Sequence, residues 1–527
     1  MAERPPVYFQ ELLQLADVGI CQPTITSENV TMESDKNIVI DNKQEVVIIE
    51  LDEPQNPTRL SISADSVIMH PTANVLALKT GKTLQIYIIE TKAIVKEHQN
   101  DEDVVFWKWI NETTIAFVTE TAVYYWSIEC DAAPVKLFDR HLSLSGTQII
   151  NYLSDADSKW LVLIGISAKD NRVVGNMQLY CTQTKVSQPI DGHAACFVRF
   201  KLEGNPFPSN LLCFSVKNEA GGKLHIIEVG SPAAGNQPFQ KKNVDVPYTA
   251  ETAQDFPVSM QVSSEQGIIY LITKHGFVHL HDIESGVHFY SDLFIPETVS
   301  VTCPLSKTPG IMGIDGKGQV FSISIDRRYV VPCVMKTLKN PDLALKLAMR
   351  GNFLGVEALF EPNICENSSN LVQHHTSRSI LELSKTCRKL GNYRISSGLL
   401  WISGSLAIQT FISDNSLNVT LNSDDSKRRF ADRLSETIGT LFCDFELCHD
   451  AYDCYMNYDS DDLKNCTKTA QEFIKLLEEF VENLFKEVLQ EFSDAGGESE
   501  NPTDKVLEKK LEKCSKIHIN GKLAHLQ

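Results

Sequence analysis

The chain has 527 residues and a mass of 59.0 kDa, more than the roughly 250–300 residues that one hydrophobic core supports, so two or more folded units are expected. Its 43% hydrophobic and 22% charged residues are close to the globular average and argue against disordered, collagen-like and membrane-bundle classes. The net charge of −19 argues against nucleic-acid binding, because contact with phosphates requires a basic face.

Residues 1–17 contain no uninterrupted apolar stretch, and the fourteen cysteines are scattered singly along the chain. We therefore expect no secretory signal and a reducing compartment, where thiols are mostly small buried hydrophobic side chains. One uncharged run, residues 395–413, approaches membrane-spanning length. Its serines and its glutamine favour a helix buried inside the protein.

Short strands separated by turn residues fill the region from about residue 37 to residue 331, and almost no stretch keeps helical periodicity for three turns. Alternating polar and apolar side chains mark strands within residues 83–88, 104–110, 121–128, 222–229 and 276–283. At four strands per blade, a β region of about 330 residues would fill a propeller of roughly six to eight blades.

The pattern changes at Asn340, where a capping Asn, a Pro in the first turn and an acidic residue predict a helix over residues 343–350. Gly351 and Asn352 end it, and a second short helix is expected over residues 353–360. Two short helices joined by a tight turn are the unit of an α-solenoid. Further helices are predicted at residues 377–390, 395–412, 426–455, 467–492 and 503–515.

The clearest amphipathic pattern follows Thr469, which stands in capping-box spacing to Glu472. Apolar residues from Phe473 to Phe492 share one helical face. That face either is buried in a helical bundle of the tail itself or makes a homo-oligomer or a contact with another subunit. Residues 441–500 hold sixteen acidic residues against four lysines, which is typical of a solvated helical surface.

Several segments stand in an order that is specific to one family. They include Thr31-Met32-Glu33-Ser34-Asp35-Lys36 and Phe106-Trp107-Lys108-Trp109-Ile110, and they continue at residues 62–66, 77–86, 171–175, 185–190, 221–229 and 340–345. In this order they resemble the N-terminal region of the clathrin heavy chain over about the first 360 residues.

The resemblance implies a seven-bladed β-propeller at residues 1–330, the start of an α-helical linker or solenoid at residues 331–360, and a divergent, acidic α-helical tail at residues 361–527. Heavy chains of this family continue through many more helical repeats to a leg and a trimerising hub. The sequence is therefore expected to be a truncated, divergent relative that does not form three-legged assemblies by itself.

In this family the propeller binds short extended peptides, of the leucine/acidic clathrin-box type, in a groove between the first and second blades. Alternation alone places Thr83, Gln85 and Tyr87 on one side of a strand. The resemblance implies an apolar wall, two polar contacts, an aromatic contact and a cation for the acidic end of the ligand, at Leu76, Thr83, Gln85, Tyr87 and Lys92. Ile94 stands where the family commonly has a second Lys, so weaker selection for acidic ends is expected.

Two other family sites are matched in part. A central pocket that reads a tryptophan-containing motif is matched at Gln148 and Ile150, but Ser27 replaces an aromatic residue. A groove between the fourth and fifth blades is matched at Gln188, but Thr184 replaces an Arg, and the loss of a guanidinium is not conservative.

No segment predicts catalysis, a metal or a cofactor. The glycines at 313, 316 and 318 follow no βα unit and indicate a hairpin. Histidines 275, 279 and 281 are interpreted as structural, and the tail cysteines 443, 448 and 454 lack the paired spacing of common zinc sites.

The sequence therefore predicts a non-enzymatic coat or interaction protein of the cytoplasm, at coated pits and coated vesicles, that serves vesicle-mediated transport and endocytosis. The expected partners are adaptor and accessory proteins, with coat subunits or a second copy as further candidates for the helical tail. No nucleic acid is expected, and a membrane only indirectly. The alternative is a truncated regulatory relative that competes for adaptors or scaffolds a helical partner.

Overall fold

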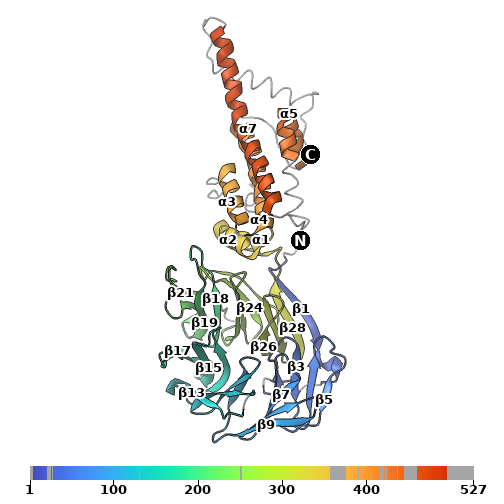
Figure 1. The fold of residues 1–527 in the computed structure, drawn as a ribbon, viewed down its shortest axis with the longest axis vertical. Helices are drawn as coiled ribbons and strands as arrows, with labels where there is room; N and C mark the ends of the chain where they lie inside the picture. Colours follow the sequence, from blue (N-terminus) through green and yellow to red (C-terminus); the bar gives the residue numbers. More distant parts are fainter. Residues whose placement is uncertain are drawn as a thin grey trace. The chain divides into compact units, whose positions relative to one another are not determined.

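The structure is a computed structural model that describes residues 4–20, 25–26, 28–129, 131–249, 252–355, 376–389, 391–414, 421, 424–435, 437–443 and 460–494. The chain divides into two compact units, Met1–Asp326 and Arg327–Gln527. The first is built of strands and the second of helices (Figure 1).

The first unit consists of seven four-stranded antiparallel sheets, or blades, in the described part of the chain. Blades 1 to 3 comprise β2 Val30–Thr31, β3 Asn37–Asp41, β4 Val46–Glu50 and β5 Thr58–Leu60; β6 Ser66–Met69, β7 Val75–Thr80, β8 Thr83–Ile88 and β9 Ala93–Gln99; and β10 Phe106–Trp109, β11 Thr114–Val118, β12 Ala122–Ser127 and β13 Val135–Asp139. Blades 4 and 5 comprise β14 Gln148–Ser154, β15 Trp160–Lys169, β16 Arg172–Cys181 and β17 Val186–Asp191; and β18 Ala194–Phe200, β19 Ser209–Asn218, β20 Gly221–Glu228 and β21 Lys242–Val246. Blades 6 and 7 comprise β22 Pro257–Ser263, β23 Ile268–Thr273, β24 Phe277–Asp282 and β25 His288–Leu293; and β26 Val299–Pro304, β27 Gly310–Asp315, β28 Gln319–Ile325 and β1 Val7–Gln14.

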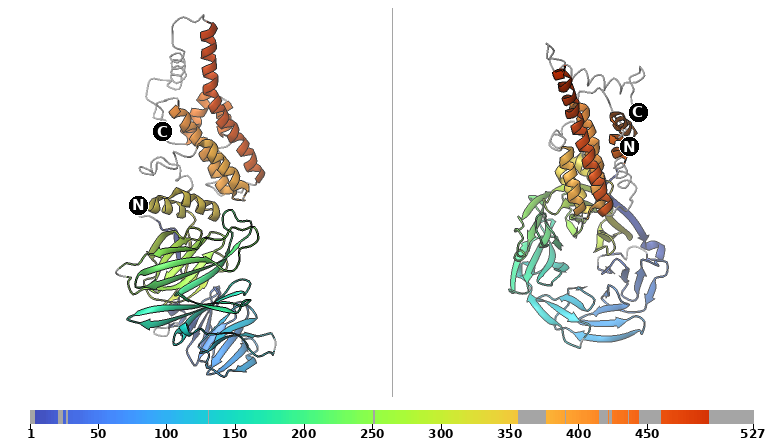
Figure 2. Two further views of the ribbon diagram at one scale, coloured as in Figure 1. Left: turned by 90° about the vertical axis from the view of Figure 1, so that its left-hand side faces the viewer. Right: turned by 45° about the horizontal axis from the view of Figure 1, so that its top comes forward.

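The blades stand around a central axis (Figure 2), which confirms the predicted seven-bladed propeller. The N-terminal strand β1 closes the ring by pairing with β28, from Val7 opposite Ile325 to Gln14 opposite Gln319. The predicted β region began near residue 37 and therefore missed β1 and β2. A bulge between Glu11 and Leu13 breaks the two-residue period of β1, so its alternation is not visible in the sequence.

Apolar side chains fill the spaces between neighbouring blades. One cluster joins blade 1, through Val39 and Ile48, to blade 2, through Val67 and Leu78. Further clusters join blades 2 and 3, 4 and 5, and 7 and 1. Most central strands therefore bury apolar residues on both faces.

The second unit contains the helices α1 Val330–Leu338, α2 Pro341–Gly351, α3 Ser377–Lys389, α4 Tyr393–Asp414, α5 Asp424–Leu434 and α7 Ser460–Asp494, and a helical segment at residues 437–443. The predicted cap of α2 is confirmed, since the Asn340 side chain accepts a hydrogen bond of 3.0 Å from the Leu343 N–H. Asn352, at a φ of 51°, ends the helix as expected.

Two helix starts were predicted wrongly. Strands were expected to residue 331, but α1 begins at Val330, because its β-branched valines resemble a strand while its buried residues keep helical spacing. The capping box at Thr469 is also wrong: α7 begins at Ser460, and the Thr469 hydroxyl donates a 3.2 Å hydrogen bond to the Asn465 carbonyl inside the helix. The helices predicted at 353–360 and 503–515, and residues 444–455, lie largely or wholly outside the described residues.

Helices α3, α4 and α7 pack side by side around one apolar cluster (Figure 1). Phe473 and Leu477, from the amphipathic face predicted for the tail, are buried in it together with Trp401 of α4. Helix α4 is long and apolar enough to cross a membrane by length and composition, but 78% of its apolar window is buried inside the structure. Three of its serines donate hydrogen bonds to carbonyl groups within the unit: Ser396 to Ser384, Ser397 to Arg394 and Ser403 to Leu400.

Candidate functional site

Strands β7, β8 and β9 carry the principal residues predicted for peptide binding. Strand β8 alternates as expected: Leu84 and Ile86 belong to the cluster between blades 2 and 3, whereas Tyr87 packs on the opposite side against the cluster between blades 1 and 2. Thr83 and Gln85 share the Tyr87 face and remain half-buried. The structure thus brings these three side chains to the face of blade 2 that is turned toward blade 1.

An apolar row crosses the three strands on this face. Leu76 on β7 lies opposite Tyr87 on β8, which in turn lies opposite Ile94 on β9. Leu76 is wholly buried, Tyr87 is half-buried, and the Ile94 side chain is 51% exposed. The row therefore leads from the core to the outer rim, with Leu76 supporting Tyr87 from behind.

The polar residues of this face are already hydrogen-bonded across the hairpin. Gln85 Nε2 donates to Glu97 Oε2 at 2.6 Å, and Thr83 Oγ1 donates to Gln99 Oε1 at 2.6 Å. Sequence reasoning missed both β9 partners, although the register of the β8–β9 hairpin could have identified them. Glu97 places a negative charge beside Gln85, on the face that was expected to receive an acidic ligand.

Lys92 lies in the turn that joins β8 to β9 and has a φ of 51°. Its side chain is exposed, and the described residues include no carboxylate in ion-pair contact with it. It precedes Ile94 by two residues. A carboxylate of a ligand lying on the apolar row could therefore meet this ammonium group.

The two secondary sites are less complete. Gln148 is exposed at the start of β14, and Ile150 lies at a bulge between Ile149 and Asn151, partly buried toward blade 5. Ser27 lies outside the described residues. The structure therefore places Gln148 and Ile150 on one strand without showing what completes a pocket around them.

Gln188 is exposed on β17, the outer strand of blade 4. It shares a strand face with Ile190, which packs against the cluster between blades 4 and 5. Thr184, in the preceding turn, bonds to the Cys181 thiol: burial would raise the pKa of this thiol, but the hydrogen bonds lower it. Thr184 thus has a local partner where the family has an Arg.

The residues interpreted as structural are packed as expected. The rings of His279 and His281 lie 5.6 and 5.0 Å from the ring of His288 in blade 6, and burial, followed by the neighbouring rings, lowers the pKa of His279 and of His281 to about 3. Within the described residues no three potential metal ligands come together. Gly318 ends the predicted hairpin turn between β27 and β28 at a φ of 83°. The tail residues Cys448 and Cys454 lie outside the described residues.

Comparison with known proteins agrees with the observed propeller fold. A family model described as the clathrin propeller repeat matches residues 144–183. The chain is 69% identical over 359 residues to "Probable clathrin heavy chain 1" of Caenorhabditis elegans, covering 67% of this chain and 21% of that protein. It is 53% identical over 364 residues to "Clathrin heavy chain 2" of Homo sapiens and 51% identical to "Clathrin heavy chain" of Drosophila melanogaster, covering 68% of this chain and 22% of each.

The matched region thus spans about a fifth of the length of these curated relatives. Homology lies in the N-terminal two-thirds of this chain, which holds the propeller and the first linker helices. The closed ring of seven blades agrees with this homology. The N-terminal two-thirds of this chain therefore holds a propeller and first linker helices of the clathrin heavy chain type.

Proposed function

We propose that this chain is a non-enzymatic, clathrin heavy chain-like coat protein whose propeller binds short extended peptides of adaptor and accessory proteins. The site is the face of blade 2 toward blade 1, and the observation that carries the proposal is the apolar row from Leu76 through Tyr87 to Ile94, with Lys92 beside it. The protein would act at the cytoplasmic face of coated pits and coated vesicles, and would reach the membrane only through its adaptors.

The chemistry of the row suits a peptide of the clathrin-box type. In an extended peptide alternate side chains point the same way, so leucines can pack on Tyr87 and Ile94 while a carboxylate reaches Lys92. Burying a leucine side chain contributes about 1.5–3 kcal/mol. An exposed ion pair contributes only about 0.2–1 kcal/mol, so the apolar contacts are expected to supply most of the affinity.

The proposal is tested by titrating a fluorescent peptide, with alternate leucines and an acidic end, against the full chain. The double variant Gln85→Ala with Lys92→Glu is expected to weaken binding several-fold, because it removes a polar contact and reverses the charge that meets the acidic end. Lys201→Glu, an exposed lysine that follows β18 in blade 5, is the matched charge-reversal control and should leave the titration unchanged. An unchanged titration for the double variant would remove the groove assignment.

A second candidate is a regulatory relative that competes for adaptors or scaffolds a helical partner. The helices α3 to α7 favour this candidate. They follow the N-terminal two-thirds of the chain, where the homology lies, so they could bind a partner of their own. Sedimentation velocity of the full chain separates the two roles. A monomer at all concentrations supports competition for adaptors, whereas concentration-dependent association supports a scaffold.

A further inference from the structure

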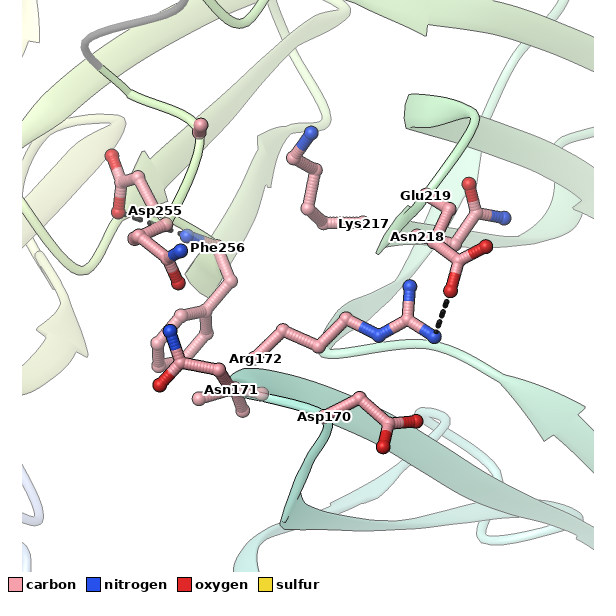
Figure 3. A pocket seen from close by; sticks show the side chains of 11 residues that line it. Asp170, Asn171, Arg172, Lys217, Asn218, Glu219, Asp255 and Phe256 are labelled. Carbon is pink, nitrogen blue, oxygen red and sulfur yellow. Dashed lines mark hydrogen bonds and ion pairs between the residues drawn. The ribbon is translucent and has the colours of Figure 1, made fainter.

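A concave site lies in the propeller, away from the proposed groove on blade 2. It is a cavity of about 370 Å³, lined by the turn between β15 and β16, the turn between β19 and β20, and residues 253–256 before β22 (Figure 3). These segments belong to blades 4 and 5 and to the connection that leads into blade 6. None of the residues predicted for peptide binding lines it.

Arg172 lines the cavity with a guanidinium group whose hydrogen-bond donors are only partly satisfied. Its Nη2 lies 2.7 Å from Glu219 Oε1, but the Glu219 side chain is 82% exposed, and the neighbouring Arg172 Nε is buried without a hydrogen-bond partner. Arg378, in the helical unit, uses the same Nε and Nη2 edge to hold both oxygens of one carboxylate. Since such paired bonds are stronger than single ones, the edge of Arg172 is incompletely satisfied.

Lys217 supplies a second cation on the cavity wall. Its Nζ lies 4.7 Å from the centre of the Tyr248 ring, and no carboxylate among the described residues forms an ion pair with it. A lysine ammonium over an aromatic ring is attracted by the ring quadrupole. An anion in the cavity could therefore contact Lys217 as well as Arg172.

Buried contacts hold the cavity in shape. His193 Nδ1 accepts a hydrogen bond from the Lys217 N–H at 3.2 Å, so its Nε2 carries the proton that is donated to the Val173 carbonyl at 3.1 Å. Burial lowers the pKa of His193, which favours this neutral form. A Cβ at Gly175 would lie 2.4 Å from the Gly192 carbonyl oxygen. Only glycine therefore allows β16 to lie this close to the backbone of Gly192.

The opposite wall adds an acceptor and apolar surface. Asp255 is fully buried; its Oδ1 accepts the N–H groups of Phe256 and His275, each at 2.9 Å, and its Oδ2 has no hydrogen-bond partner. The Phe256 and Val173 side chains also line the cavity. A ligand that combines an anion, an N–H donor and an apolar stem matches these walls, whereas a free phosphate has no apolar stem to pack on Phe256 and Val173.

We propose that this cavity binds the glutamate side chain of a partner peptide. The ligand carboxylate takes both Nε and Nη2 of Arg172 and lies near Lys217, its methylene stem packs on Phe256, and a peptide N–H donates to Asp255. Glu219 holds the anion position in the unbound protein and is displaced by the ligand. The site is separate from the groove on blade 2 and extends the range of peptides that one propeller can bind.

Saturation-transfer NMR on the full chain tests this with the peptide acetyl-Gly-Glu-Gly-amide, its Gln counterpart and inorganic phosphate as probes. The Glu peptide is expected to bind and the Gln peptide to bind several-fold more weakly. Arg172→Gln should abolish the difference, whereas Glu219→Gln should strengthen binding several-fold, because it removes the internal competitor. Arg199→Gln, an exposed arginine of blade 5 paired with Asp157, is the matched control and should change nothing.

Equal binding of the two peptides, or binding unaffected by Arg172→Gln, would overturn the proposal. If Arg172→Gln fails to fold, Glu219→Gln provides the test by itself. Unchanged or weaker binding of the Glu peptide to that variant would contradict the assignment. Binding of phosphate without binding of the Glu peptide would also contradict it. The double variant Gln85→Ala with Lys92→Glu should leave this binding intact, so failure here is distinguishable from failure of the proposed groove.

Discussion

In the proposed groove, Gln85 is hydrogen-bonded to Glu97 and Thr83 to Gln99, both on β9, before any peptide binds. A peptide that uses the Gln85 amide must replace a charge-assisted hydrogen bond with one of its own. The Glu97 carboxylate then remains on the surface of the groove and repels an acidic ligand. In the proposed groove, affinity is therefore expected to depend on the β9 residues as much as on the β8 residues that the sequence indicated.

Glu97→Gln is predicted to tighten binding of a peptide with an acidic end by about two- to five-fold, the range of one exposed charge interaction. The amide at position 97 carries no charge and removes the repulsion, while its oxygen can still accept the hydrogen bond from Gln85. Titration of the full chain measures the change, and the same peptide with its acidic residues replaced by amides is the control. Equal tightening for both peptides would show that repulsion by Glu97 is not the cause.

At this scale the sequence indicated which side chains share a face but not which of them are satisfied. Alternation along β8 was sufficient to separate Tyr87 from Leu84 and Ile86. The partners on β9 depend on hairpin register, and a bulge between Ile86 and Tyr87 shifts that register by one residue. The Arg172 cavity was not predicted at all, because it is formed by three segments that are distant in the sequence.

At the scale of elements, blade 6 buries two neutral histidines, His279 on β24 and His281 on the same strand, beside His288 on β25. The buried Asp282 follows His281 in the chain, and the half-buried Tyr248 ring lies 6.0 Å from the His279 ring. Because the folded-state pKa of both histidines is lowered from 6.5 to about 3, the unfolded chain binds more protons between these values. Their neutral form therefore favours the folded state above pH 6.5.

The stability of the propeller is predicted to fall as the pH is lowered from 6.5 toward 3. Replacing both residues, His279→Gln with His281→Gln, should make the melting temperature less dependent on pH within this window, even if the variant is less stable at pH 7. The exposed His275→Gln is the control and should keep the slope of the parent chain. An identical slope in the double variant would show that these histidines do not contribute.

The helix α2 depends on its N-terminal cap. Asn340→Ala removes the acceptor of the Leu343 N–H and is predicted to reduce the stability of the helical unit by about 0.5–2 kcal/mol, measured by denaturant unfolding of the full chain. Asn352→Gly, at the other end, keeps the left-handed conformation and should cost almost nothing. A similar loss for both variants would argue against a specific role of the cap.

Element types were predicted better than their boundaries. The start of α2 was found because Asn340 and Pro341 act locally, through a side-chain hydrogen bond and a fixed φ. The start of α1 was missed because the burial of its valines at helical spacing overrides their preference for strands. Thr469 misled because its hydroxyl bonds back to a carbonyl within the helix instead of capping it.

For the whole molecule, strand patterns alone limited the first unit to a propeller of six to eight blades, and the ordered resemblance fixed the number at seven. The closure by β1 was not visible, since it joins Val7 to Ile325 across the full length of the propeller. The proposed function belongs to the same scale, because it depends on the face of blade 2 that is turned toward blade 1 and involves no chemical step. The two proposed sites lie on different blades, so one propeller could hold two peptides together.

The most direct test of this account is photo-crosslinking of the full chain to a clathrin-box-type peptide that carries a photoreactive leucine. We predict cross-links within residues 76–99, above all at Tyr87 and Ile94, and their loss on competition with the unlabelled peptide. Competable cross-links confined to other blades, or none at all, would contradict the groove on blade 2.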